Sequence, residues 1–257
     1  MLQLLRAMLN LPMLALVMCR SAGIMLAAPV LSSASVPMQV KAALSFLLAV
    51  IMLPFAAQHA GAMPSHAFGY LPLAVNELGL GLLIGFSAAL VLAALESAGG
   101  LIAHEIGLTL ASVASPESME EEESAISVLM ALFGVLLFLS VNGHHWIIQA
   151  LAASYRTMPI GQVPWGASSA RMVDEGFSGF LVETLRLAAP LMGMMFLVTV
   201  VIALVAKAAP QMNILLVGYP VKVMMGVVAM VLTFPLIWPV LRGAFGDLHA
   251  HLMRFVR

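Results

Sequence analysis

Apolar residues along this chain gather into six long stretches that are separated by short polar segments. The stretches run approximately over residues 4–28, 40–57, 71–95, 126–150, 180–206 and 214–241. Proline, glycine, serine or charged residues mark the segments between them, as is typical of turns. A helix needs about 20 predominantly apolar residues to cross the ~30 Å hydrocarbon core of a bilayer. The pattern therefore predicts an all-α, polytopic helical membrane protein with about six hydrophobic helices or hairpins, some of them broken.

The composition excludes a water-soluble fold. Of the 257 residues, 62% are hydrophobic and 9% are charged, and the mean hydropathy is +1.06, whereas soluble domains are about half apolar. The start of the chain, Met1 to Ala28, could be a signal peptide, but Met18 is bulky where a cleavage site needs a small residue. We interpret this segment as a retained first helix, and expect residues 1–257 to form a single integral membrane subunit.

Charge and cysteine content exclude several kinds of partner and cofactor. Eleven Lys and Arg residues nearly balance twelve Asp and Glu residues, and no run of basic residues could follow a phosphate backbone, so nucleic acid is not a partner. Cys19 is the single cysteine, and no Cys/His cluster has the spacing of metal ligands. The sequence therefore predicts no metal and no cofactor.

Ionisable residues near the end of the third stretch are the first candidates for proton handling. Charged groups at membrane depth are costly and usually face a cavity or a partner. Successive four-residue steps place Glu96 and His104 on one helical face, and Glu105 lies about 100° away. We prefer the alternative that the helix leaves the bilayer here and that His104 and Glu105 lie at its wet end.

The segment after these residues combines small apolar positions with an acidic run. Glu120 to Glu123 could suggest a cation site, but four consecutive carboxylates spread around a helix and repel one another. Ser118 and Glu121 have the spacing of a capping box, and acidic residues in a first turn favour the positive end of the helix dipole. A solvated helix start explains the run without a ligand.

Two further polar motifs interrupt apolar stretches. Asn142-Gly143-His144-His145-Trp146 contains adjacent histidines, which do not share a helical face and lack a third ligand, so a structural polar site is preferred over a metal site. Pro210-Gln211-Met212-Asn213, followed by Gly218-Tyr219-Pro220, predicts a kinked or interrupted helix near Pro220. Both motifs are candidate structural or subunit-contact sites, with Asn142, Gly143, His144, Pro210, Gln211, Asn213, Gly218 and Pro220 as their members.

These motifs, taken in order, resemble those of the FliR/SctT family, the R-type (or T-type) membrane subunit of the type III export apparatus. The resemblance covers nearly the whole chain. It includes Arg20-Ser21-Ala22-Gly23, Ala28-Pro29-Val30-Leu31-Ser32, Phe138 to Trp146, Met158-Pro159-Ile160-Gly161, and Ala209 to Ile214 followed by Gly218 to Lys222. The Asn-Gly-His and Gly-Tyr-Pro segments are more similar to the flagellar branch. Departures from the family pattern lie at Glu105, at Ser115-Pro116 and in the acidic run.

The resemblance implies a non-enzymatic subunit of a flagellar protein export gate in the bacterial inner membrane, within the basal body. Its partners would be P-type and Q-type membrane subunits, B-type and A-type export components, the lipid bilayer, and unfolded proteins in transit. In the family, the loop after the third hydrophobic region enters the channel as a plug, and the corresponding loop here is residues 107–123. The candidate plug residues are Gly107, Leu108, Leu110, Ala111, Val113, Pro116 and Met119.

Three other functions are alternatives to a flagellar export gate. A virulence (injectisome) export subunit is the alternative within the same family. A proton-coupled small-molecule transporter would use Glu96, His104 and Glu105 as a polar relay. An intramembrane enzyme is disfavoured because the sequence contains no nucleophile elbow, HExxH or paired-aspartate motif.

Overall fold

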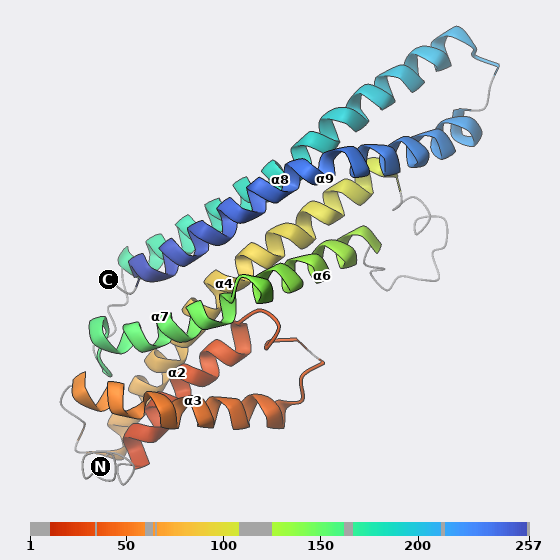
Figure 1. Cartoon of the computed structure of the whole chain (residues 1–257). Coiled ribbons are helices and arrows are strands. Elements are labelled where there is room, and N and C mark those ends of the chain that lie inside the picture. Colours follow the sequence, from red (N-terminus) through yellow and green to blue (C-terminus); the bar gives the residue numbers. More distant parts are fainter. Residues whose placement is uncertain are drawn as a thin grey trace. The chain divides into compact units, whose positions relative to one another are not determined.

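The chain is described by a computed structural model that covers residues 11–33, 35–59, 64, 66–107, 125–161, 167–211 and 214–255 (Figure 1). All the regular elements in these ranges are helices. They are α2 (Leu11–Ala27), α3 (Met38–His59), the 3-10 helix η1 (Ala67–Gly69), α4 (Tyr70–Ile106), α6 (Ala125–Ser140), α7 (Gly143–Thr157), α8 (Ala167–Ala208) and α9 (Ile214–Phe255). The prediction of an all-α polytopic fold is confirmed.

Between three and five helices in the described part of the chain are long and apolar enough to cross a membrane. Three qualify alone: α3, α4 and residues Val173–Ala208 of α8. Two bent pairs qualify if each counts as one span, namely α6 with α7 and the two parts of α9. The apolar helix α2 has 17 residues and is shorter. The six expected stretches therefore correspond to these five candidates and α2.

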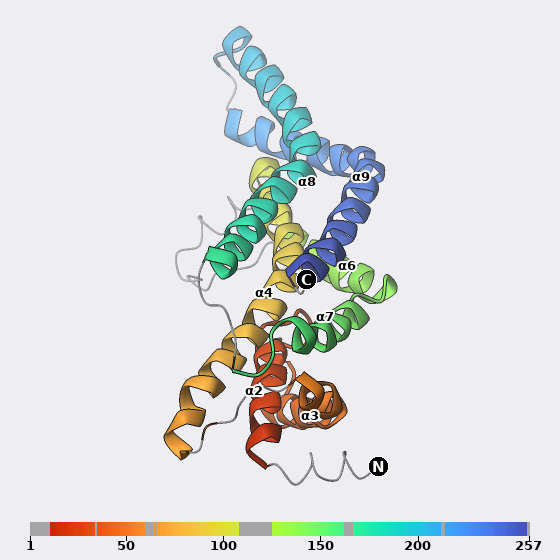
Figure 2. The same cartoon turned by 90° about the vertical axis from the view of Figure 1, so that its left-hand side faces the viewer.

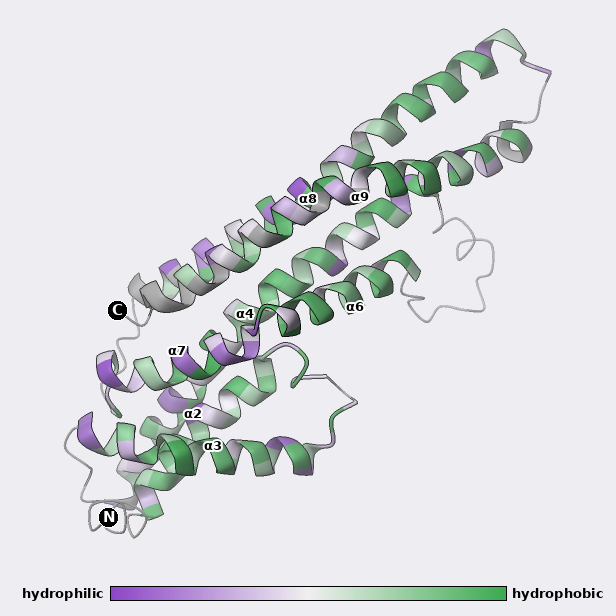
Figure 3. Cartoon of the chain, in the orientation of Figure 1, coloured by the Kyte–Doolittle hydropathy of each residue, from purple (hydrophilic) through white to green (hydrophobic). Residues whose placement is uncertain are grey.

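Several helices are longer than the hydrocarbon core is thick. Helices α8 and α9 have 42 residues each, which is roughly 63 Å at 1.5 Å per residue, against ~30 Å of hydrocarbon. Figure 3 shows apolar residues over the second half of α8 and more polar residues along its first half. The apolar stretches predicted from the sequence are shorter than these helices, because each helix continues through polar residues that lie beyond the hydrocarbon core.

The described helices belong to two compact units. Unit 1 comprises Met1–Val91, Phe138–Ser178 and Phe245–Arg257, and unit 2 comprises Leu92–Leu137 and Gly179–Ala244. In unit 1, α2 lies beside α3 (Figure 2), and α3 also contacts α7. In unit 2, the end of α4 packs on α6, where a Cβ added at Gly99 would lie 2.8 Å from the Cα of Ser127.

Glycines bring the backbones of α2 and α4 into direct contact within unit 1. A Cβ added at Gly23 would collide with the carbonyl of Leu78, and one added at Gly81 would collide with the carbonyl of Arg20. A Cβ at Gly85 would lie 2.9 Å from the backbone nitrogen of Ala28. Small residues allow such close approach between helices of membrane proteins, so this contact fixes Arg20 next to the first part of α4.

Two bends interrupt the apolar helices. The first separates α6 from α7 by 63°, at Asn142, whose φ of 59° is left-handed. The second separates Val217–Thr233 from Trp238–Asp247 by 58°, next to Pro235. The helix is not interrupted at Pro220, because α9 continues through that position. Pro220 lies near the helix start, where few preceding carbonyls are affected, whereas Pro235 lies in the helix interior.

Candidate functional site

The most deeply buried polar side chains of unit 1 converge on Arg20. Arg20 lies on α2, Glu77 on the first part of α4, and Ser154 and Tyr155 in the last turn of α7. Each of these four side chains belongs to a residue with a relative exposure of 0%. Together with the carbonyl of Met158, they form what we call the Arg20 cluster. It joins three helices that are distant in the sequence.

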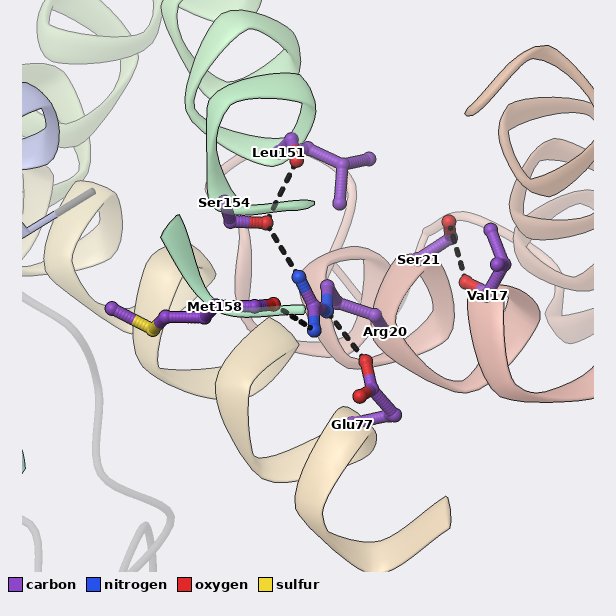
Figure 4. A network of polar contacts seen from close by, with 7 residues as sticks. All are labelled: Val17, Arg20, Ser21, Glu77, Leu151, Ser154 and Met158. Carbon is purple, nitrogen blue, oxygen red and sulfur yellow. Dashed lines mark hydrogen bonds and ion pairs between the residues drawn. The ribbon is translucent and has the colours of Figure 1, made fainter. Parts of the chain in front are cut away.

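Each guanidinium nitrogen of Arg20 donates to a different acceptor (Figure 4). Nε donates to Oε2 of Glu77 at 2.6 Å, Nη1 to Oγ of Ser154 at 2.9 Å, and Nη2 to the carbonyl of Met158 at 3.0 Å. Ser154 in turn donates to the carbonyl of Leu151 at 2.7 Å. The planar fork of an arginine suits acceptors in several directions at once, which a lysine ammonium on its flexible stem does not.

Tyr155 covers the cluster from α7. The Cζ atom of Arg20 lies 4.3 Å from the centroid of the Tyr155 ring, within the range of a cation–π contact. Oε1 of Glu77 is buried and has no hydrogen-bond partner among the described residues. A buried ion pair of this kind contributes little net stability relative to apolar residues, but losing one partner leaves a costly unpaired charge. The two charges therefore depend on one another.

The cluster connects two of the motifs that identified the chain by sequence. Arg20 opens the Arg20-Ser21-Ala22-Gly23 segment, and its guanidinium reaches Met158, the first residue of Met158-Pro159-Ile160-Gly161. Gly161 has a φ of +87°, which favours glycine, and a Cβ there would lie 3.0 Å from Cδ2 of Leu73 on α4. The two motifs meet because one supplies the donors and the other a turn that presents its carbonyl.

The chemistry of the cluster is that of a structural connection. Its members are a guanidinium, a carboxylate, a serine hydroxyl that already donates to the backbone, and a phenol ring. Among the residues that the structure describes, no group of three or more His, Cys, Asp or Glu side chains could hold a metal ion. The arrangement holds helices together and presents no nucleophile beside a general base.

The proposed polar relay lies elsewhere on α4. Glu96 and His104 are exposed and Glu105 is half-buried, with His104 and Glu105 in the last turn of the helix. The preferred interpretation, that this end of α4 lies in water, stays a prediction. A relay role for the three residues stays a prediction.

The Asn142 motif forms the bend between α6 and α7. Asn142 accepts a hydrogen bond from the backbone N–H of His145 at 2.9 Å through its carbonyl and is exposed. A Cβ added at Gly143 would collide with the ring of Phe138, so this position requires glycine. His144 is half-buried, and its Nδ1 is buried with no hydrogen-bond partner among the described residues. The motif thus has a structural role, and its use as a subunit contact stays a prediction.

The remaining candidates are at the turn between α8 and α9, or outside the described residues. Pro210 and Gln211 form an exposed turn, Gly218 is half-buried and Pro220 exposed on α9. Asn213 and the plug candidates Leu108, Leu110, Ala111, Val113, Pro116 and Met119 lie outside the described residues. Gly107 is described: it is buried at the end of α4 with a φ of +91°.

Sequence reasoning missed Glu77. Arg20 entered the sequence analysis only as part of the Arg20-Ser21-Ala22-Gly23 motif, and Glu77 of the third stretch was not among the candidates. The signal was available, because Arg20 lies well inside the first stretch, Glu77 is the charged residue of the third, and the two are of opposite sign. Ionisable residues within apolar spans commonly pair with one another.

The chain is similar to known bacterial export proteins over most of its length. The model of the family "Bacterial export proteins, family 1" matches residues 11–248. The flagellar biosynthetic protein FliR of Escherichia coli (strain K12) is 30% identical over 221 residues, which is 86% of this chain and 84% of that protein. FliR of Aquifex aeolicus (strain VF5) is 35% identical over 186 residues, 69% of this chain and 68% of that protein.

A translocation protein is among the similar proteins as well. The Yop proteins translocation protein T of Yersinia pestis is 33% identical over 159 residues, which is 61% of this chain and 60% of that protein. The match to the Escherichia coli protein extends over a larger share of both chains.

Proposed function

This chain belongs to the bacterial export proteins, family 1, and from that membership we propose that it is a non-enzymatic subunit of a flagellar type III protein export gate. It is a multi-pass protein of the inner membrane. Its place in the basal body is part of the proposal. In that place it would line part of the channel through which unfolded proteins cross the membrane.

The observation that carries the proposal is the family match, which extends from α2 to the second half of α9. The structure is consistent with a chain that works inside an assembly. In Val173–Ala208, only 17% of the most apolar window is buried, and this helix continues beyond the ~30 Å that lipid can cover. Exposed large apolar side chains are found on α8 from Val173 to Val205, a longer stretch than the hydrocarbon core covers, so part of this surface is available for contact with other proteins.

The expected partners are the P-type and Q-type membrane subunits, with B-type and A-type components at the periphery. The test is to co-express a tagged copy of this chain with the P- and Q-type candidates from its own genome and purify it in mild detergent. We expect a stable mixed complex. A well-behaved chain that consistently purifies alone would favour the small-molecule transporter, and flux by the purified chain in liposomes would then be measurable.

We further propose that residues 107–123 form the plug of the channel. Support comes from the point where this loop begins, at the end of α4. A Cβ added at Gly226 of α9 would lie 2.6 Å from Cγ1 of Ile106, so α9 packs tightly on the last residue of α4 within unit 2. The N–H of Gly107 donates to the carbonyls of Ala103 and His104 at 3.1 and 3.0 Å. The base of the loop is thereby anchored.

The plug assignment is tested by shortening residues 107–119 in a gate shown to assemble. We expect resting ion leakage to rise, because an apolar seal has been removed. Unchanged leakage would show that these residues are not the plug. The proposed mechanism is a two-state seal that rearranges around a passing chain, with the driving force supplied by a partner ATPase and the proton motive force.

The flagellar and virulence assignments are separated by complementation. The similarity to the Yersinia pestis protein keeps the virulence function as the second candidate. We expect the chain to restore motility to a strain of its own species that lacks it. Restoration of effector secretion with no effect on motility would favour the virulence apparatus.

A further inference from the structure

The turn that follows α7 is held by a side chain from the beginning of the sequence. Arg20 binds Ser154, in the last turn of α7, and the carbonyl of Met158, the residue directly after the helix. The N–H of Met158 donates to the carbonyl of Ser154 at 2.9 Å. One guanidinium therefore contacts both the end of the helix and the residue at which the chain leaves it.

Local preference fixes only part of this turn, because Pro159 restricts its own φ and disfavours a helical Met158, while Gly161 can adopt several conformations. Met158 has φ −124° and ψ 78°, which is not helical, and Gly161 has a φ of +87°. Glycine populates positive and negative φ about equally, so a turn that contains it has several accessible conformations. The contact with Arg20 selects one of these.

An apolar pair could fill the same space as Arg20 and Glu77, but it could not hold the turn in one conformation. Buried ion pairs are often no more stabilising than well-packed apolar residues of similar volume. What apolar residues lack is the set of donors that Arg20 directs to Glu77, Ser154 and Met158. The guanidinium is thus required for the conformation of the turn more than for the stability of the fold.

We propose that Arg20 and Glu77 are positioning residues of the export gate. Glu77 orients the guanidinium, and the guanidinium fixes the turn at Met158–Gly161, which sets the course of the chain after α7. This inference rests on the proposed function only for its export readout. The position of the turn is measurable in the chain alone.

The test uses a spin label at Thr157, which is exposed at the end of α7. Cys19 is replaced by Ala so that Thr157→Cys is the single thiol. The test variant is R20M/E77M, which keeps the volume and removes both charges. The matched control is E183Q/R186Q, which removes a surface ion pair with relative side-chain exposures of 16% for Glu183 and 62% for Arg186.

The expected result is a mobile component in the spectrum of R20M/E77M. Each charge-assisted hydrogen bond lost should shift the equilibrium between held and released turn by roughly tenfold. The control should match its parent. The amount of R20M/E77M and its co-purification with the P- and Q-type subunits should stay near the parent level, while export per assembled gate falls by about tenfold or more.

An unchanged spectrum together with unchanged export would overturn the inference. If R20M/E77M does not accumulate, S154A decides instead, since it removes one acceptor and leaves the ion pair. It should give a smaller mobile component, and an immobile label in S154A would refute the positioning role. Failure of the parent chain to assemble with P- and Q-type subunits would refute the proposed function and leave the label result valid.

Discussion

Nε of Arg20 lies 2.6 Å from Oε2 of Glu77, although 57 positions separate the two residues in the sequence and neither side chain is exposed. The pair joins α2 to α4 at the place where glycines bring their backbones together. Ser154 and the carbonyl of Met158 add α7 to the same connection. The stability of unit 1 should therefore respond strongly to changes at a few positions.

Removing the charge of Glu77 should destabilise the chain. In E77Q the guanidinium stays buried without a counter-charge, and breaking a buried pair costs about 3–5 kcal/mol. We expect a lower midpoint of thermal unfolding in detergent and less protein in the membrane. R20M/E77M should recover most of the loss, because neither charge remains. A single variant as stable as its parent would show that the pair is not formed.

Arg20→Lys should fail to replace arginine although the charge is kept. An ammonium cannot reach Glu77, Ser154 and the Met158 carbonyl in the geometry of the fork. A hydrogen bond to a charged group contributes about 1.5–3 kcal/mol, so the loss should be at least of that size in thermal unfolding. R186K is the control at the surface pair, where about 0–1 kcal/mol is at stake. An equal loss of stability in R20K and R186K would contradict the hydrogen bonds assigned to Arg20.

Gly81→Ala should separate α2 from α4. The new methyl group would collide with the backbone carbonyl of Arg20, which cannot move independently of its helix. Overpacking of this kind typically costs about 1–3 kcal/mol. Gly193→Ala is the control, because nothing lies within 4 Å of that added Cβ, and its stability should be unchanged or raised by up to about 1 kcal/mol. Thermal unfolding of both variants distinguishes the two cases.

Gly226→Ala should disturb the base of the proposed plug loop. The methyl group would press on Ile106, whose branched side chain has few alternative rotamers. In an assembled gate we expect increased ion leakage at rest with little change in the amount of complex. Gly243→Ala on the same helix has open space around its added Cβ and serves as the control. Ion leakage that stays at the parent level would show that the contact between Gly226 and Ile106 does not affect the seal.

The fold was largely predictable from sequence because apolar length and breaking residues have direct structural consequences. The six stretches overlap the long helices, whereas the bend at Asn142 was not predicted. The position of the second bend was not predictable, because Pro220, Pro235 and Pro239 all lie in α9 and tertiary packing decides which of them the helix accommodates. Hydropathy also could not show that α8 begins well before its apolar half.

Only part of the candidate site could be predicted from the sequence. Arg20 stands out in an apolar helix, but its partners lie 57 and 134 positions away, and one acceptor is a backbone carbonyl that has no sequence signature. The residues favoured by local density of charge, Glu96, His104 and Glu105, are exposed or half-buried. Local charge density therefore indicated a helix end, while the buried site depended on pairing across the chain.

The pairing of α2 with α4 also has a consequence for biogenesis. During synthesis, α2 emerges from the ribosome with Arg20 long before Glu77 has been made. An arginine near the centre of a helix within the bilayer opposes membrane insertion by about 2.5–3.5 kcal/mol. We therefore expect α2 to enter the lipid more readily once α4 is present, because Arg20 and Glu77 then form a neutral pair.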